Sequence, residues 1–208
     1  MNELFEDYIN RWENEPSQIR SELPLLLGKI KIERVWAMPN KWTFTIKPIK
    51  KLLWEELCPG CKNNNDDRDR YISGWCDPFA GNNSWAEIRN DINGKTDAQY
   101  NLDALSFLKR MYSNNFIGVL YDPPYSITQA RMYGKKEFSS MKYWADCKNE
   151  IARIIKPGGK AICFGWNSMG LGKNRGFEMT RILLVAHGGS KNDTIVTVET
   201  KLYPPQRR

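Results

Sequence analysis

Hydrophobic positions from residue 71 onward form short apolar runs separated by amphipathic segments. Runs of this kind, rich in branched and aromatic side chains and bounded by turn-forming residues, are typical of strands. The strands predicted in this way span 72–77, 86–91, 99–102, 117–121, 160–165, 181–186 and 194–201. The segments 104–112 and 142–155 repeat apolar residues at helical spacing, which predicts helices. We therefore expect an α/β fold with a mostly parallel seven-stranded sheet, closed by an antiparallel pair.

Further elements are predicted upstream of this region. An amphipathic helix is expected near the N-terminus because five apolar residues share one face at helical spacing: Leu4, Phe5, Tyr8, Ile9 and Trp12. Alternating apolar and charged residues predict a strand over 29–36. Pro48 is well placed in the first turn of a helix that continues over 49–57. We divide the chain into an N-terminal extension, 1–40, and one larger domain, 41–208.

Composition narrows the class of protein. The chain has 208 residues with 31 Lys+Arg against 24 Asp+Glu, and its net charge of +7 favours a polyanionic partner. The longest apolar run is about five residues, far below the ~20 that a membrane-spanning helix needs. Five cysteines, an odd number, fit a reducing compartment, so we expect a cytoplasmic protein. Cys58 and Cys61 have C-x-x-C spacing without a second such pair, which favours a turn with two thiols and no metal.

Two turns follow strands of the predicted sheet, where ligands of α/β proteins bind. The first is D-P-F-A-G at 77–81, and the second is D-P-P-Y at 122–125. Together with T-I-K-P at 45–48, they make the chain resemble the amino-methylating DNA methyltransferases, which use S-adenosyl-L-methionine. The resemblance covers about 42–201. It implies a Rossmann-like methyltransferase fold and a catalytic domain over 41–208.

The D-P-P-Y residues suit the methylation of an exocyclic amino group. Such a nitrogen is a poor nucleophile because its lone pair is delocalised into the base. The Asp122 carboxylate and the Pro123 carbonyl can accept both amino hydrogens and draw the nitrogen toward tetrahedral geometry. Pro124 helps to stiffen the turn, and Tyr125 offers a flat face on which an extruded base can stack. The resemblance implies that these four residues are catalytic.

The resemblance also implies a cofactor site. Its predicted members are Asp77, Pro78, Phe79, Ala80, Gly81, Asn82, Asp91, Asp103, Thr45 and Lys47. A carboxylate at Asp91 can accept from ribose hydroxyls, and the family places an acidic residue at Asp103 against adenine. Local alternatives remain open: either carboxylate can serve as a helix cap or loop residue, and Phe79 can belong to the core. Only a short segment separates Gly81 from the second strand, so the helix usual there in the family is expected to be missing.

Basic and aromatic residues follow the fourth and fifth predicted strands. They are Arg131, Lys135 and Lys136 in the first loop, and Trp166, Lys173 and Arg175 in the second. Basic side chains bind nucleic-acid phosphates, and aromatic rings stack on unstacked bases. We therefore expect both loops at the catalytic rim, the edge of the sheet where the D-P-P-Y turn lies. The alternative is a pair of solvated charged loops.

These features predict transfer of a methyl group to adenine N6 in DNA. Cytosine N4 in DNA and adenine in RNA are alternatives, because either amino group suits the same pair of acceptors. A non-catalytic nucleic-acid-binding subunit and a zinc-dependent binding module are further alternatives. The chain has no room for a separate target-recognition domain. The segment that recognises the target sequence is therefore short or absent, or recognition comes from a second copy of the chain or a partner subunit.

Overall fold

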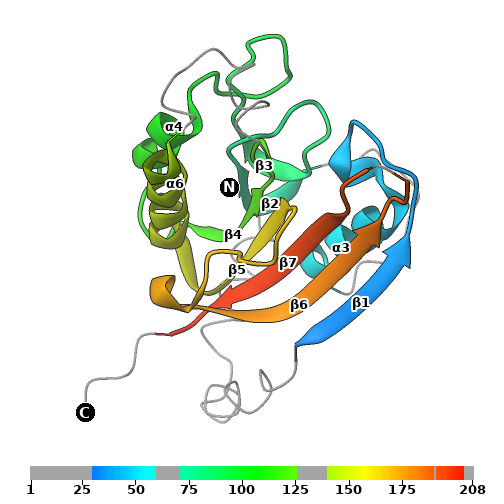
Figure 1. Cartoon of the computed structure of the whole chain (residues 1–208). Coiled ribbons are helices and arrows are strands. Elements are labelled where there is room, and N and C mark those ends of the chain that lie inside the picture. The colour runs from blue at the N-terminus through cyan, green and yellow to red at the C-terminus, as the bar shows by residue number, and fades with distance from the viewer. Residues whose placement is uncertain (1–29, 60–70, 126–139, 190, 204–208) are drawn as a thin grey trace.

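The computed structural model describes residues 30–59, 71–125, 140–189 and 191–203. The predicted N-terminal helix lies outside these residues. Seven strands form one sheet in the order β1-β6-β7-β5-β4-β2-β3 (Figure 1). Their bounds are β1 Lys31–Trp36, β2 Ile72–Asp77, β3 Ala86–Arg89, β4 Phe116–Tyr121, β5 Ile155–Gly165, β6 Phe177–Ala186 and β7 Thr194–Lys201. The helices are η1 Thr43–Thr45, α3 Lys47–Leu57, α4 Ala104–Arg110, α6 Met141–Ile154 and η3 Lys173–Arg175.

Neighbouring strands run parallel except at β7, which is antiparallel to both β5 and β6. The predicted fold class, a mostly parallel seven-stranded α/β sheet closed by an antiparallel pair, is confirmed. The membership of the sheet differs from the prediction at its two edges, however. Residues 99–102 form only an isolated bridge, between Asn90 and Tyr100, and β1 supplies the seventh strand at the far edge.

Side-chain chemistry explains why residues 99–102 do not extend the sheet. The Gln99 side chain accepts from the backbone N–H of Arg89 (2.8 Å) and donates to the carbonyl of Glu87 (2.7 Å). The Arg89 N–H and the Glu87 carbonyl of β3 therefore bond to a side-chain amide. In a regular sheet they would bond to the backbone of a neighbouring strand. A sequence pattern of strand type does not reveal this substitution.

Strand β1 is fixed to the sheet by a charge cluster around Arg181 of β6. The Arg181 guanidinium bonds to Glu33 of β1 (2.6 Å) and to Glu55 (2.7 Å) and Glu56 (3.2 Å) of α3. Lys160 of β5 also pairs with Glu56, at 2.8 Å. The strand that we assigned to the N-terminal extension is therefore bound to β6 and α3 as part of the same sheet.

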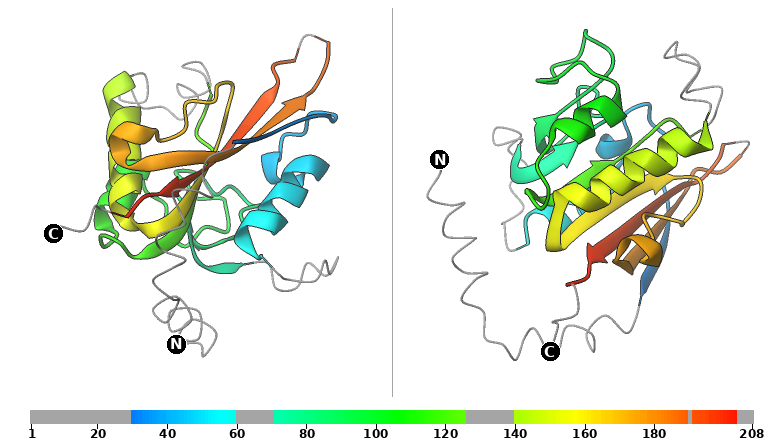
Figure 2. Two further views of the ribbon diagram at one scale, coloured as in Figure 1. Left: turned by 90° about the horizontal axis from the view of Figure 1, so that it is seen from below. Right: turned by 90° about the vertical axis from the view of Figure 1, so that its left-hand side faces the viewer.

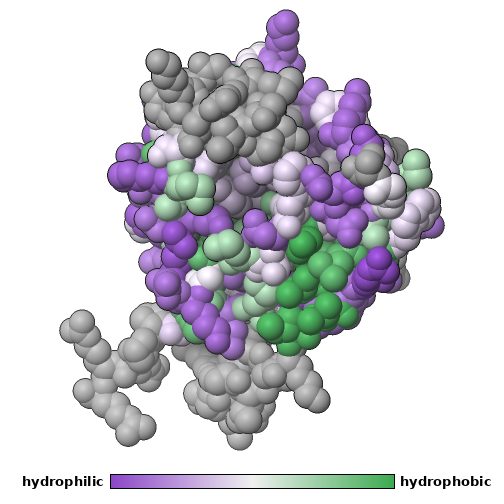
Figure 3. All heavy atoms as spheres, in the orientation of Figure 1, coloured by the Kyte–Doolittle hydropathy of each residue, from purple (hydrophilic) through white to green (hydrophobic). Residues whose placement is uncertain are grey.

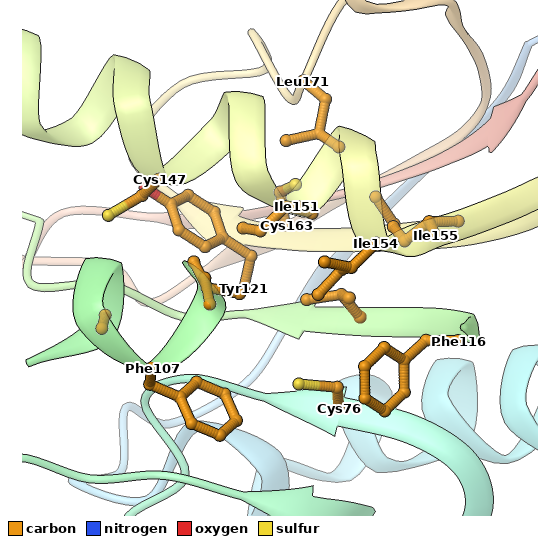
Figure 4. Close-up of a cluster of buried hydrophobic side chains, with 14 of the residues drawn as sticks. Cys76, Phe107, Phe116, Tyr121, Cys147, Ile151, Ile154, Ile155, Cys163 and Leu171 are labelled. Carbon is orange, nitrogen blue, oxygen red and sulfur yellow. The ribbon is translucent and has the colours of Figure 1, made fainter. Parts of the chain in front are cut away.

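The helices cover both faces of the sheet, α3 on one side and α4 with α6 on the other (Figure 2). One core cluster joins α3 to strand residues such as Leu120, Ile162 and Val198. In the other cluster, side chains from β2, β4 and β5 face α4 and α6 (Figure 4). Both clusters bury the central strands, which places the ends of β2 and β4 on a rigid support.

The face of β1 and β6 opposite α3 is apolar and is not covered by any helix of the described residues. Ile30 and Ile32 are exposed there, and Ile182 and Leu184 of β6 are half-buried. Figure 3 shows the corresponding hydrophobic patch over these two strands. Helices α4 and α6 stop short of this edge because they pack on β2, β4 and β5.

Candidate active site

The two turns that the sequence singles out meet at one edge of the sheet. β2 ends in Asp77, β4 is followed directly by Asp122, and the two strands are parallel neighbours, with Trp75 opposite Gly118. The carboxyl groups are close enough for the charge of Asp122 to raise the pKa of Asp77. The structure thus brings the predicted cofactor turn and the predicted catalytic tetrapeptide together.

Asp77 holds the cofactor turn from inside. Its carboxylate is fully buried and accepts from the backbone N–H of Phe79 (2.8 Å) and the hydroxyl of Ser84 (2.7 Å). Burial, with smaller contributions from the charges of Asp122 and Asp91, raises its pKa to about 7 against the lowering effect of those two bonds. Asp77 therefore braces the turn, and its side chain does not face solvent.

The backbone of the turn is tied to the next strand. Gly81 has φ of 52°, a left-handed conformation that glycine adopts without strain. Its N–H donates to Asp91 (2.8 Å), whose other oxygen accepts from the N–H of Asn93 (2.8 Å). The N–H of Ala80 donates to the carbonyl of Asn90, 2.9 Å away. Asp91 thus lies beside the turn, as the prediction of a shared cofactor site requires.

Asn90 is a structural member of this site that the sequence analysis does not identify. Its buried side-chain amide donates to the carbonyls of Pro78 (3.1 Å) and Leu102 (2.9 Å) and accepts from the N–H of Leu102 (3.0 Å). The cofactor turn and the segment before α4 are joined by this one side chain. No motif marks it, since its role depends on two segments that meet only in the folded chain.

Other predicted cofactor residues lie around the turn with local partners. Asp103 is the N-cap of α4: it accepts from the N–H of Ser106 (3.1 Å) and from the Tyr143 hydroxyl (3.4 Å). The capping alternative is therefore present, which leaves the contact with adenine a prediction. The half-buried Phe79 packs against Tyr121 and Trp144, and Asn82 accepts from the N–H of Asp97 at 3.0 Å.

Asp122 is the best-placed acceptor of the tetrapeptide. Its half-buried carboxylate accepts a hydrogen bond from the Tyr125 hydroxyl and another from the Thr43 side chain. Desolvation raises the pKa of Asp122 to about 6, and these two bonds act in the opposite direction. The same surroundings raise the pKa of Tyr125, which stays a neutral donor. Pro123 and Pro124 are half-buried between them.

Thr43, two positions before the predicted Thr45, is the residue near T-I-K-P that reaches the D-P-P-Y turn. The Thr45 hydroxyl instead donates to the carbonyl of Trp42 (2.8 Å) and accepts from the Asn40 amide (3.0 Å). Lys47 is exposed at the first position of α3. Contact of Thr45 and Lys47 with a cofactor stays a prediction.

The second basic loop is only partly at the catalytic edge. The Trp166 ring packs against Tyr125 with ring centres 5.8 Å apart and is 43% exposed. Lys173 and Arg175 instead lie before the first residue of β6, which pairs with Lys201, at the opposite edge of the sheet. Arg175 bonds to Asn149 of α6 (2.8 Å). The expectation that these two share the rim is wrong, and their contact with nucleic acid stays a prediction.

The reason for this displacement is a buried carboxylate. Glu199 of β7 accepts from the backbone N–H groups of Leu171 and Gly172, the latter at 3.0 Å. These bonds draw the loop back along the sheet, away from the end of β5. The remaining predicted basic residues, Arg131, Lys135 and Lys136, lie outside the described residues.

The described residues offer no clustered metal ligands. Among residues 30–59, 71–125, 140–189 and 191–203, no three His, Cys, Asp or Glu side chains are grouped so that they could hold a metal ion. Cys58 is disulfide-bonded, so the expectation of a free thiol at this position is wrong. Cys61 lies outside the described residues. No helix in the described part of the chain has the length and apolarity needed to cross a membrane.

Comparisons with known proteins show a distant structural likeness. No protein-family model and no curated sequence matches the chain. The solved structure of TrmN from Thermus thermophilus is 15% identical with a TM-score of 0.46, over 76% of this chain and 49% of that one. A second Thermus thermophilus protein, described provisionally as a DNA modification methylase, is 12% identical with a TM-score of 0.35, over 50% and 54%. PH0851 is 12% identical with a TM-score of 0.39, over 61% and 42%.

The chain spans about half the length of these solved structures. Each likeness is weak, so the function proposed below rests on the residues of this chain.

Proposed function

We propose that this protein transfers a methyl group from S-adenosyl-L-methionine to an exocyclic amino group of a nucleic-acid base, with adenine N6 in DNA as the preferred target. The observation that carries the proposal is the Asp122 carboxylate, held by Tyr125 and Thr43 next to a braced strand-end turn. A rigid acceptor beside a cofactor turn is the arrangement that this reaction needs.

The residues around the turn fit this cofactor by charge. S-adenosyl-L-methionine carries a sulfonium and an ammonium group, and when bound it supplies an activated methyl group. Asp77, Asp91 and Asp122 converge on the turn. Burial is the main cause of the raised pKa of Asp77, and repulsion from the charges of Asp122 and Asp91 raises it further. A cationic ligand relieves that repulsion. Asp91 still has acceptor capacity for hydroxyl groups, because each of its oxygens accepts only one backbone N–H in the described contacts.

Asp122 and the Pro123 carbonyl together receive the substrate amino group. Two acceptors fix the two amino hydrogens, so the nitrogen lone pair turns away from the base ring. That lone pair forms the bond to the methyl carbon as the carbon–sulfur bond breaks, and the sulfur keeps the bonding electrons. The methylated nitrogen then loses one proton. Asp122 is a suitable acceptor for it, since its pKa is raised to about 6.

The two aromatic rings beside Asp122 offer a surface for the base. Tyr125 and Trp166 meet edge to face at 5.8 Å, from the ends of β4 and β5. A base taken out of its stack needs a flat apolar partner, and both rings can provide one. This supports nucleic acid as the substrate class.

The choice of adenine in DNA rests on the resemblance of D-P-P-Y to adenine-directed family members. Cytosine N4 in DNA and adenine in RNA use the same acceptor pair, so the site geometry accommodates all three. We further propose that target choice depends on a second copy or a partner subunit. A direct test is transfer of an isotopically labelled methyl group to DNA and RNA, with Asp122→Ala as the inactive control. Cofactor binding without transfer by the wild-type protein would favour a non-catalytic subunit.

A further inference from the structure

The chain between β1 and α3 passes along the carboxyl edge of the sheet toward the candidate active site. The N–H of Ala37 donates to the carbonyl of Ala186 at the end of β6 (3.0 Å), and the Ala37 carbonyl contacts His187 Nδ1 (2.8 Å). Six residues later, the Thr43 side chain reaches Asp122 and Tyr125 beyond the end of β4. Residues 37–43 are here called the rim segment.

The rim segment takes a direct route. β6, β7 and β5 separate β1 from β4, so the two strands are about 19 Å apart at ~4.8 Å per step. Six residue steps span at most about 20 Å. The segment therefore crosses the ends of the intervening strands, and its chain bends at Lys41 and Trp42. In Figure 1 it leaves the tip of β1 beside the tip of β6 and the start of β7.

Side-chain bonds hold the segment in place. Asn40 accepts from the N–H of Trp42 (3.1 Å) and donates to the Thr45 hydroxyl (3.0 Å). Thr45 in turn donates to the Trp42 carbonyl through its hydroxyl (2.8 Å) and through its N–H (3.0 Å). The His187 ring, which contacts Ala37, also contacts the Thr194 hydroxyl at 2.8 Å. The surface that the segment presents is therefore built before any ligand arrives.

That surface combines aromatic and apolar side chains with a cation. Met38 is 67% exposed and Trp42 is 38% exposed, and Trp36, just before the segment, is 66% exposed. The Lys41 ammonium lies 4.8 Å from the centre of the Trp42 ring. Single exposed apolar residues are ordinary, but these three lie within seven positions of Thr43, whose side chain reaches Asp122 and Tyr125.

We propose that the rim segment binds an unpaired stretch of nucleic acid next to the target base, which rests on the function proposed above. Bases stack on Trp42 and Trp36, and Lys41 meets a backbone phosphate. Exposed indole rings with a neighbouring cation suit unpaired strands, because stacking tolerates every base. A paired base would first have to leave its duplex, whereas an unpaired base reaches Tyr125 without that cost.

The test measures binding of full-length protein to a fluorescently labelled single-stranded DNA with one central adenine. Because stacking on an aromatic side chain contributes about 1–3 kcal/mol per base, we expect Trp42→Ala to weaken this binding by about tenfold. Trp42→Phe, which keeps a flat ring, should recover most of it. Lys41→Ala should flatten the salt dependence by a slope of about 0.7, the value for one phosphate on a single strand.

Matched controls are available at the other edge of the sheet. Tyr112 is 82% exposed beyond the end of α4, so Tyr112→Ala removes an exposed aromatic ring away from the rim segment. We expect this variant to bind as the wild type does. All variants should keep wild-type affinity for S-adenosyl-L-methionine.

The outcomes separate this proposal from the proposed function. Wild-type binding by Trp42→Ala, equal losses in Trp42→Ala and Tyr112→Ala, or a loss confined to duplex DNA would overturn the role of the rim segment. In those cases methyl transfer by the wild-type protein would still support the proposed enzymatic function. Weakened binding by Trp42→Ala, without any methyl transfer by the wild type, would instead keep the rim segment and remove the catalytic proposal.

Discussion

Thr43 and Asp122 come from segments far apart in the chain, yet the Thr43 side chain hydrogen-bonds to the Asp122 carboxylate. The Tyr125 hydroxyl donates to the same carboxylate. Tyr125 and Thr43 thus fix the orientation of the Asp122 carboxylate. Their bonds also lower its pKa, which burial raises. The ends of β4 and of the rim segment are therefore coupled at the acceptor on which the proposed chemistry depends.

Replacing Thr43 tests this coupling. Hydrogen bonds to charged groups contribute about 1.5–3 kcal/mol, so Thr43→Val should lower kcat/KM for methyl transfer by about 10- to 100-fold. Thr43→Ser keeps the hydroxyl and should retain most of the activity. Steady-state kinetics on both variants measures the difference. Equal losses of kcat/KM in Thr43→Val and Thr43→Ser would show that Thr43 acts through packing and not through its hydroxyl.

Activity should depend on pH through Asp122. When ionised, the carboxylate accepts at both oxygens, whereas protonation turns one of them into a donor, and its pKa is raised to about 6. We therefore expect kcat/KM to fall as pH decreases through about 6 and to be independent of this group well above it. This fall in kcat/KM is the acidic limb of the pH profile. In Thr43→Val the acidic limb should move to higher pH, because a bond that lowers the pKa of Asp122 is lost.

Asp77 provides the control for that assignment. Its pKa is raised to about 7, but its buried carboxylate braces the turn. Asp77→Asn should leave the acidic limb of the kcat/KM profile near pH 6. A limb that disappears in this variant would assign the titration to Asp77 and contradict the role given to Asp122.

Cofactor affinity should depend on the charge of Asp91. Asp91→Ala removes the acceptor of the Gly81 N–H and a carboxylate beside the turn. Charge-assisted hydrogen bonds of this kind contribute about 1.5–3 kcal/mol, so the Kd for S-adenosyl-L-methionine should rise by about 10- to 100-fold. Asp91→Asn separates the two effects, because it keeps an acceptor oxygen without the charge. Calorimetry that gives an unchanged Kd for Asp91→Ala would remove this residue from the site.

Stability should depend on Arg181 at the junction of β1, β6 and α3. Removing one member of a buried ion pair costs about 3–5 kcal/mol, but the Glu33 and Glu55 partners are partly exposed and screened. We therefore expect Arg181→Leu to lower the free energy of unfolding by about 1–3 kcal/mol in urea denaturation. Lys51→Ala removes a more exposed pair with Glu55 and should cost less than about 0.5 kcal/mol. Similar losses in the two variants would argue against an anchoring role for Arg181.

Most of the elements could be predicted because local signals bound them. β2 and β7 match the predicted spans, and β4 begins one residue early, since apolar runs there end at Asp or polar turns. Pro157, Gly158 and Gly159 were expected to separate α6 from the next strand. They lie inside β5 instead, which begins directly after α6, and Gly158 has φ of 79°. A glycine in that conformation accommodates the irregular pairing of β5 with β4 between Ile155 and Lys160.

The candidate site was predictable only where it is contiguous in sequence. Asp77 ends β2 and Asp122 follows β4, so each lies in a turn that the sequence marks, and the strand order of the folded sheet then brings the two turns together. Thr43 and Asn90 carry no motif, because their partners come from other segments. The position of Lys173 depends on the bonds from Glu199 to the backbone of the preceding loop, which no charge pattern reveals.

The measurement that tests the central claim most directly is mass spectrometry of nucleosides after incubation with S-adenosyl-L-methionine that carries an isotopically labelled methyl group. Single-stranded DNA, duplex DNA and RNA are tested separately, with wild-type protein and with Asp122→Ala. The account predicts labelled N6-methyladenine in DNA from the wild type, and none from Asp122→Ala although that variant still binds the cofactor. Product formed equally by both proteins, or no labelled base from the wild type on any substrate, would contradict it.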